Sequence, residues 1–392
     1  MKIIIFGLIS GRGGIQTHTY WLTKTLLESN YRVLIITPRF VKSHGGAFVE
    51  TELFNPNLKI ISLNDESINK KQSILDKIVE NIDLLRQIRL FSPDIFFGVG
   101  TGWYMTFISL FLPPQTKKIF HEVMSGKTYT KKDPRWGVKY FFTDVYAQAS
   151  DVGKNFNETF NWQKEIPVLP AFPEPLEITA QLPQVESKII PLGKAKAALF
   201  SRLAPHKQAF WLVQQWDFLK NYLDELHIHG SGSEESLIRN YIEEKGIGDK
   251  VKCFGRYPDG QAYVDLLSSY DLTLLPTIGA EGSPLVLLES MACGVPFVAY
   301  GVGGIPDYGY NNPDVIVVPP EPWLTTQARE YTTTSPQGEI KAFLAGVQVM
   351  AENLAKGEIN QLRLQQFYFD HYSYNVLKRL WLLYLSNKTT ND

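Results

Sequence analysis

Short apolar strands alternate with amphipathic helices along this 392-residue chain, and that alternation is the feature that most limits its fold. In the first half, apolar residues at helical spacing separate the expected strands, which are residues 2–6, 32–37, 95–99, 118–121 and 144–147. Strands that alternate with helices are typical of a parallel, doubly wound sheet. The first half is therefore predicted to be an α/β domain.

The same alternation resumes after a proline-rich segment at residues 166–193. Here the expected strands are 197–201, 226–229, 251–254, 272–276 and 296–299, and the expected helices are 210–222, 234–245, 261–269 and the one after Ser283. A chain of this length is too long for one comfortable core, and proline-rich segments are common domain boundaries. We therefore expect two Rossmann-like domains, at 1–180 and 190–371. Ligands of such sheets bind beyond the carboxyl ends of the strands.

The composition excludes several other classes of protein. A hydrophobic content of 44% with 20% charged residues indicates a globular chain, and a net charge of −1 gives no overall attraction to nucleic acid. Cys253 and Cys293 lie in apolar stretches of the sequence and are interpreted as buried free thiols of a reducing compartment. The N-terminus has the pattern of a first strand rather than of a signal peptide, so we expect a cytoplasmic protein.

Two glutamates eight residues apart, Glu281 and Glu289, bracket an expected helix start. Ser283 is a suitable N-cap and Pro284 suits the first helical position, so the amides of residues 283–286 could bind a phosphate. The two carboxylates would then accept hydrogen bonds from a sugar on one side and a ribose on the other. The alternative is a capped surface helix whose glutamates are only solvated.

This pair of glutamates, the Ala-Cys-Gly-Val-Pro that follows it and the Gly-Val-Gly-Gly-Ile-Pro at 301–306 resemble a known signature. This signature marks the donor site of retaining glycosyltransferases with the GT-B fold, in family 4 (glycosyl transferases group 1). The resemblance implies two domains facing a central cleft, a last helix (372–386) that crosses back to the first domain, and donor contacts from Gly282, Ser283, Pro284 and Leu285.

A basic loop follows the first strand of the second half. Arg202 and Lys207 lie five residues apart there and resemble the family's Gly-Arg-Leu…Lys-Gly segment, in which both charges contact the donor diphosphate. Such charges would stabilise a departing nucleoside diphosphate. The sequence departs from the family at Ser201 and Gln208, where glycine is usual. The alternative is a solvated basic loop.

The glycines after the first strand, Gly13 and Gly14, are placed by the resemblance against the donor phosphates or the acceptor. A tight turn or a nicotinamide cofactor are the alternatives. The cofactor is disfavoured because no Gly-x-Gly-x-x-Gly is completed and the second strand ends in Thr37-Pro38 instead of an acidic residue.

Further family positions are His121, which would contact the transferred sugar, and Gly230 and Tyr257 in loops around the nucleoside. A structural histidine and ordinary turns are the alternatives. His227 and His229 lie on one strand face, but no third ligand of suitable spacing follows, so no metal site is expected.

Together these features predict a retaining hexosyltransferase. It would move a sugar from a nucleotide sugar, UDP weakly favoured over GDP, to an acceptor hydroxyl, with no cofactor and no metal, since the chain has no Asp-x-Asp. The alternatives are a GT-B sugar-nucleotide epimerase and a catalytically idle nucleotide-sugar-binding partner subunit. A basic stretch with aromatics at 127–136 indicates a solvated loop, or contact with an anionic acceptor or a membrane surface.

Overall fold

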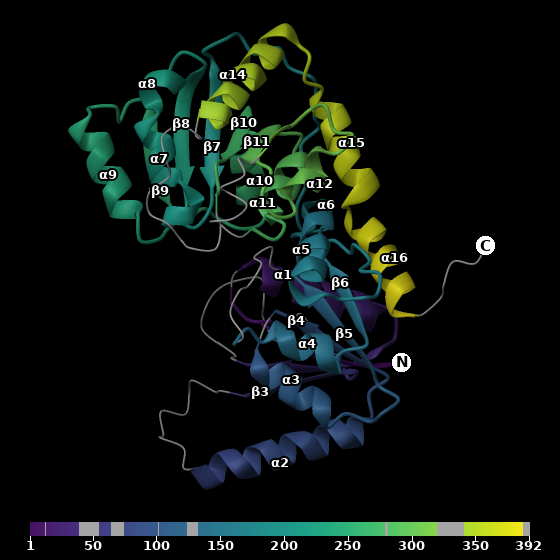
Figure 1. The fold of residues 1–392 in the computed structure, drawn as a ribbon. Coiled ribbons are helices and arrows are strands. Elements are labelled where there is room, and N and C mark those ends of the chain that lie inside the picture. The colour runs from purple at the N-terminus through teal and green to yellow at the C-terminus, as the bar shows by residue number, and fades with distance from the viewer. Residues whose placement is uncertain are drawn as a thin grey trace. The chain divides into compact units, whose positions relative to one another are not determined.

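The computed structural model describes residues 1–11, 13–38, 55–63, 74–100, 102–123, 132–278, 281–319 and 341–386. The chain forms two compact units (Figure 1). The first comprises Met1–Phe172 together with Lys378–Asp392, and the second is Pro173–Leu377. The chain thus leaves the first unit within the proline-rich segment, and its last helix passes from the second unit into the first.

The first unit is built on a six-stranded parallel sheet in the order β3-β2-β1-β4-β5-β6. Its strands are β1 (Lys2–Phe6), β2 (Arg32–Thr37), β3 (Leu58–Ser62), β4 (Ile95–Val99), β5 (Lys117–Glu122) and β6 (Asp144–Ala147). Its helices are α1 (Gly14–Glu28), α2 (Ile74–Phe91), α3 (Trp103–Leu110), α4 (Arg135–Phe141), α5 (Ser150–Phe160) and most of α16 (Tyr374–Leu385).

The second unit repeats this plan with a sheet in the order β12-β11-β10-β7-β8-β9. Its strands are β7 (Ala195–Phe200), β8 (Leu223–His229), β9 (Val251–Gly255), β10 (Leu272–Leu275), β11 (Phe297–Tyr300) and β12 (Ile316–Val318). Its helical segments are α6 (Leu176–Thr179), η1 (Pro205–Lys207), α7 (Ala209–Gln214), α8 (Trp216–Leu219), α9 (Glu235–Glu244), α10 (Gln261–Ser268), α11 (Leu285–Ala292), α12 (Ile305–Gly309), α14 (Lys341–Lys356) and α15 (Gln361–His371). Counted from its first strand, each sheet has the order 3-2-1-4-5-6 of a Rossmann fold. The prediction of two Rossmann-like parallel sheets is confirmed.

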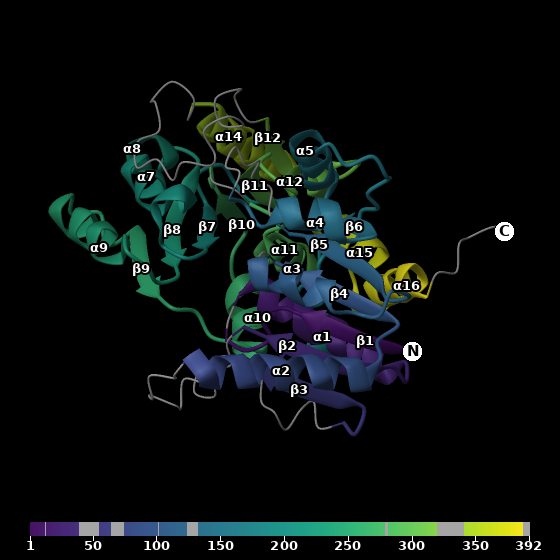
Figure 2. The same cartoon turned by 60° about the horizontal axis from the view of Figure 1, so that its bottom comes forward.

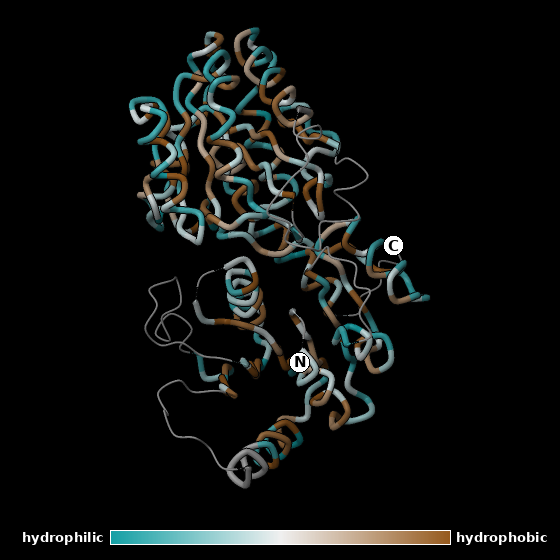
Figure 3. Tube along the Cα trace, turned by 60° about the vertical axis from the view of Figure 1, so that its left-hand side comes forward, coloured by the Kyte–Doolittle hydropathy of each residue, from teal (hydrophilic) through white to brown (hydrophobic). Residues whose placement is uncertain are grey.

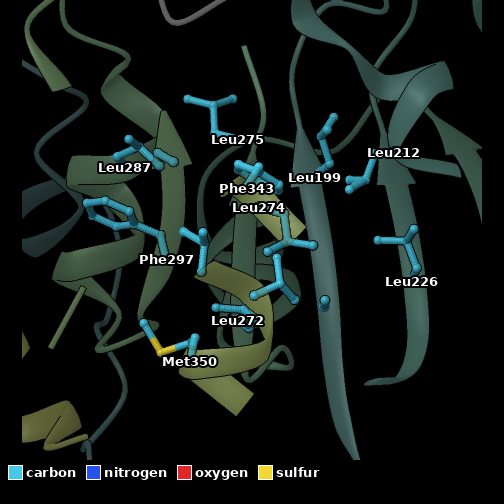
Figure 4. Close-up of a cluster of buried hydrophobic side chains, with 14 of the residues drawn as sticks. Leu199, Leu212, Leu226, Leu272, Leu274, Leu275, Leu287, Phe297, Phe343 and Met350 are labelled. Carbon is cyan, nitrogen blue, oxygen red and sulfur yellow. The ribbon is translucent and has the colours of Figure 1, made fainter. Parts of the chain in front are cut away.

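Buried aliphatic and aromatic side chains hold each sheet to its helices. In the second unit, Leu199, Leu274 and Phe297 from the strands pack with Phe343 and Met350 of α14 (Figure 4). The hydrophobic colour runs through the interior of each unit (Figure 3). A strand covered by helices on both faces has no polar side, which is why central strands such as β1, β10 and β11 are mostly apolar.

Some predicted boundaries differ from the structure. The edge strands β3 and β12 were not predicted, and the helix expected at 210–222 is two short helices, because Gln215 turns at φ −86° and ψ 8° between them. The last helix begins at Tyr374, whose backbone N–H donates to Glu177 Oε1 at 2.7 Å. In the described part of the chain, no helix is long and apolar enough to cross a membrane.

Candidate functional site

The site predicted in the second half lies where the strand order of the second sheet reverses. β7 and β10 are neighbours in the sheet, but the chain continues from them towards opposite edges. The loops that follow two such strands diverge and leave room for a ligand at their carboxyl ends. Arg202 and Lys207 follow β7, and Glu281 follows β10. The topology therefore brings together residues that are more than seventy positions apart.

Lys207 and Glu281 form an ion pair across this point. Both side chains are largely buried, with exposed fractions of 12% and 11%. The hydroxyl of Thr277 lies 3.1 Å from Glu281 Oε1 and 3.1 Å from the backbone oxygen of His206, so it ties the two loops to each other. A second link is the N–H of Ile278, which donates to the backbone oxygen of His206 at 3.0 Å. These two links hold together the loops that carry Lys207 and Glu281.

The charges around Lys207 favour an incoming anion. Burial, and after it the charge of Arg202, lowers the pKa of Lys207. The same two cations, together with burial as the largest cause, lower the pKa of His206 to about 4. Arg202 itself is exposed. A bound anion would relieve the repulsion between these neighbouring cations.

The helix after Glu281 begins one residue later than predicted. Pro284 is the N-cap of α11, in an extended conformation at φ −66° and ψ 111°, and Ser283 lies outside the helix. The prediction that Ser283 caps this helix is therefore wrong, and no side chain caps it. The amides that open the helix are those of Leu285 and Val286, which still point out of its N-terminus.

A second loop packs against the start of this segment. The N–H of Gly304 donates to the oxygen of Gly282 at 2.5 Å. Gly303 has φ +62°, and a Cβ there would overlap the backbone oxygen of Glu281. Only glycine fits such a position without strain. The Gly-Val-Gly-Gly motif therefore fixes the backbone from which Glu281 extends.

Glu289 lies inside α11 and accepts a hydrogen bond of 2.7 Å from the hydroxyl of Tyr263. Burial raises the pKa of Glu289 to about 7; the bond from Tyr263 opposes this, and the charge of Glu174 adds to it. The ring of Tyr263 is stacked on that of Tyr257, with centroids 5.2 Å apart. Glu289 is therefore a carboxylate that is costly to keep ionised, next to a pair of aromatic rings.

Gly230 follows β8 with φ +145°, and a Cβ there would overlap the backbone oxygen of Ser201. It lets the loop after β8 approach the basic loop after β7. In the first unit, Gly13 is the N-cap of α1 and Gly14 its first residue, and both are exposed. Their contact with a ligand stays a prediction.

His121 lies at the end of β5, as expected, but its side chain is fully buried. Its Nε2 is 3.0 Å from the backbone oxygen of Leu169, and its ring packs edge-on against Trp381 and 4.9 Å from the ring of His18. Burial lowers the pKa of His121 to about 3. These contacts provide a packing role within the first unit, and the contact of His121 with a sugar stays a prediction.

The two histidines of β8 have a common hydrogen-bonding partner. The hydroxyl of Tyr270 lies 2.9 Å from Nδ1 of His227 and 2.7 Å from Nε2 of His229. Within the described residues, no group of three or more His, Cys, Asp or Glu side chains is placed to hold a metal ion. The need for a metal stays untested by this geometry.

Sequence reasoning missed Thr277, Tyr263 and Glu174. Thr277 follows β10, at the edge of the sheet where ligands bind, and that position could have identified it. Tyr263 belongs to a helix with no motif, and Glu174 lies between two prolines, so neither has a local signal.

Residues 195–329, which include Arg202, Lys207, Glu281 and Glu289, match the family model of glycosyl transferases group 1. An exopolysaccharide phosphotransferase of Streptomyces coelicolor is 37% identical over 124 residues, 30% of this chain and 13% of that protein. The GtfA subunit of the UDP-N-acetylglucosamine–peptide N-acetylglucosaminyltransferase of Streptococcus gordonii is 29% identical over 167 residues, 42% of this chain and 30% of that protein. The chain thus spans less than a third of the length of these two curated relatives.

A solved structure of HepE from Anabaena in complex with UDP matches this fold with a TM-score of 0.66 at 15% identity, over 98% of this chain and 99% of HepE. Together with the two sheet orders, this likeness identifies the GT-B fold. The matched family model places a glycosyl transferases group 1 domain in the second half of the chain.

Proposed function

We propose that this protein is a glycosyltransferase that transfers a hexose from a UDP-sugar to an acceptor hydroxyl with retention of the anomeric configuration. The observation that carries the proposal is the buried Lys207–Glu281 ion pair at the reversal of the second sheet, with Arg202 beside it. The family match over 195–329 supports the same reaction class.

In this proposal the ion pair exchanges partners when the donor binds. The diphosphate is attracted by Lys207, Arg202 and the opening amides of α11, and Lys207 then pairs with a phosphate oxygen instead of Glu281. The released carboxylate of Glu281 is free to accept hydrogen bonds from hydroxyls of the sugar. The cations stabilise the charge that grows on the diphosphate as the glycosidic bond breaks.

Glu289 binds the ribose in this scheme. An ionised carboxylate accepts hydrogen bonds from two neighbouring hydroxyls, and this charged acceptor is worth roughly 1.5–3 kcal/mol in all. Tyr263 orients the carboxylate through its hydroxyl. Tyr257, stacked on Tyr263, provides an aromatic surface beside the nucleoside.

UDP is favoured as the nucleotide because the names of the GtfA relative and of the HepE complex both specify it. Retention is proposed because the motif at 281–306 resembles the donor site of retaining glycosyltransferases. The leaving diphosphate would assist deprotonation of the acceptor on the same face of the sugar. Neither a metal nor a cofactor is part of this proposal.

Thermal-shift measurements with UDP, GDP and their glucose and N-acetylglucosamine forms test the donor. A ligand that binds only the native state raises the unfolding midpoint, and we expect UDP forms to raise it most. Glu289→Ala should lose roughly 1.5–3 kcal/mol of UDP affinity by calorimetry, and Glu244→Gln, at an exposed position on α9, is the control. An unchanged affinity in a folded Glu289→Ala variant would exclude the ribose role.

Turnover separates the remaining alternatives. A transferase consumes the UDP-sugar faster when an acceptor is added, whereas an epimerase converts it without one and an idle binding subunit leaves it intact. NMR of the product's anomeric proton reports the stereochemistry. A product of inverted configuration would reject the retaining mechanism while leaving the transfer itself in place.

A further inference from the structure

Helix α3 presents its apolar side to solvent. Its outward residues recur at positions i, i+4, i+7 and i+8, and they are Trp103 (52% exposed), Phe107 (39%), Leu110 (52%) and, just past the helix end, Phe111 (51%). Its buried face includes the hydroxyl residues Thr106 and Ser109. A surface helix normally has the opposite pattern, with polar residues outward. The exposed stripe therefore lacks an apolar partner within the described residues.

Helix α4 extends this surface. It lies next to α3 in both views (Figures 1 and 2). The two helices pack closely because Gly137 lies against Thr106, where any side chain would collide. Tyr140 and Phe141, at the end of α4, are 68% and 42% exposed. Six large apolar or aromatic side chains thus lie on two adjoining helices, and we call them the α3–α4 surface.

The charge beside the α3–α4 surface is positive. Lys132 is exposed, and its backbone oxygen accepts a hydrogen bond of 3.1 Å from the indole of Trp103. The ammonium of Lys139 lies 5.6 Å from the ring of Trp136 and 5.8 Å from that of Tyr140. Neither α3 nor α4 contains an acidic residue.

The basic stretch predicted at 127–136 contributes only in part to this charge. Residues 127–131 lie outside the described residues. Arg135 is not a solvated cation, because it is buried and paired with Glu122 at 3.2 Å and with Asp133 at 2.9 Å.

We propose that the α3–α4 surface docks the protein on a membrane of anionic phospholipid. Exposed tryptophan, phenylalanine and tyrosine side chains fit the boundary between headgroups and acyl chains, and nearby lysines are attracted to anionic headgroups. A second copy of the chain is a poorer occupant. A twofold contact through this surface would bring Lys132 and Lys139 close to their own copies, and like charges repel.

Flotation of the full-length protein with vesicles tests the proposal. We compare phosphatidylcholine vesicles with vesicles that contain phosphatidylglycerol in addition, and we expect binding only to the second kind, weakened by high salt. Leu110→Ser with Phe111→Ser should weaken binding at least roughly tenfold, because two half-exposed apolar side chains can no longer enter the bilayer. Lys139→Glu should also weaken it roughly tenfold.

The matched control is Leu237→Ser with Leu362→Ser, two leucines of similar exposure on α9 and α15 of the second unit. This pair should bind vesicles like the unaltered protein. Thermal unfolding of each variant shows whether it is folded. UDP binding by calorimetry depends on the second unit, so a failure of the proposed function and a failure of docking are separate results.

Three results with vesicles would overturn the proposal. They are absence of binding to anionic vesicles, equal binding by the Leu110/Phe111 variant, and equal binding to neutral vesicles. A fourth is a concentration-dependent dimer in sedimentation that this variant abolishes, because the surface would then bind a second copy of the chain.

Discussion

Replacing Glu289 by glutamine should stabilise the folded protein at pH 8 while weakening its binding of UDP. In the folded protein, burial raises the pKa of this carboxyl from its ordinary 4.5 to about 7. The folded state therefore keeps a proton that the unfolded chain gives up at lower pH. The stability that Glu289 contributes is complete below pH 4.5 and is lost as the pH rises through 7.

The size of the effect follows from this difference. One pKa unit corresponds to about 1.4 kcal/mol, so the interval sets an upper limit of roughly 3 kcal/mol. Partial contact with water reduces it, and we expect about 1–3 kcal/mol at pH 8. Glutamine resembles the protonated acid, and its carbonyl oxygen can still accept the hydrogen bond from Tyr263.

The assay is the difference in thermal midpoint between Glu289→Gln and the unaltered protein at pH 5, 6, 7 and 8. The difference should be smallest at pH 5 and reach several degrees at pH 8, since 1 kcal/mol shifts the midpoint of a unit this size by about 2–4 °C. Glu244→Gln should show no such trend. Parallel profiles for Glu289→Gln and the unaltered protein from pH 5 to 8 would refute the reasoning.

Three other predictions concern the basic loop and the leaving group. Arg202→Ala and Lys207→Ala should each lower kcat far more than the unfolding midpoint, because their charge acts mainly in the transition state; near-normal rates in both would mean that the phosphate site is elsewhere. Activity should survive excess EDTA, since these cations and the N-terminus of α11 supply the positive field; a loss that magnesium or manganese restores would contradict this. Gln208→Gly should be neutral or stabilising by up to ~1 kcal/mol in urea unfolding, because Gln208 has φ +57°, which glycine adopts without strain. A clear loss of stability would show that the 2.7 Å hydrogen bond from the Gln208 side chain to the backbone oxygen of Pro205 contributes more than the relief of strain.

The central strands and the donor motif were predictable from sequence. The central strands β1, β2 and β4 have the predicted bounds, because a strand buried on both faces has a continuous apolar sequence bounded by polar or turn residues. Arg202 and Lys207 were identified from a basic loop after a predicted strand, and Glu281 from the pair of glutamates at a helix start, in both cases with the resemblance to the family's motifs. The edge strand β3 is interrupted by Lys59, and β12 has only three residues, so neither has a long apolar run that would mark it as a strand.

Only the tertiary structure decided which of these residues contact each other. The ion pair between Lys207 and Glu281 depends on β7 and β10 being neighbours, and sheet order is not encoded in the local sequence of either strand. The same holds for Tyr263, which reaches Glu289 from another helix and has no motif of its own. The sequence by itself determined which residues have the chemistry, because that depends on residue type and strand ends. The tertiary structure determined burial and partners, and therefore the charge state, because desolvation acts only once distant segments have packed together.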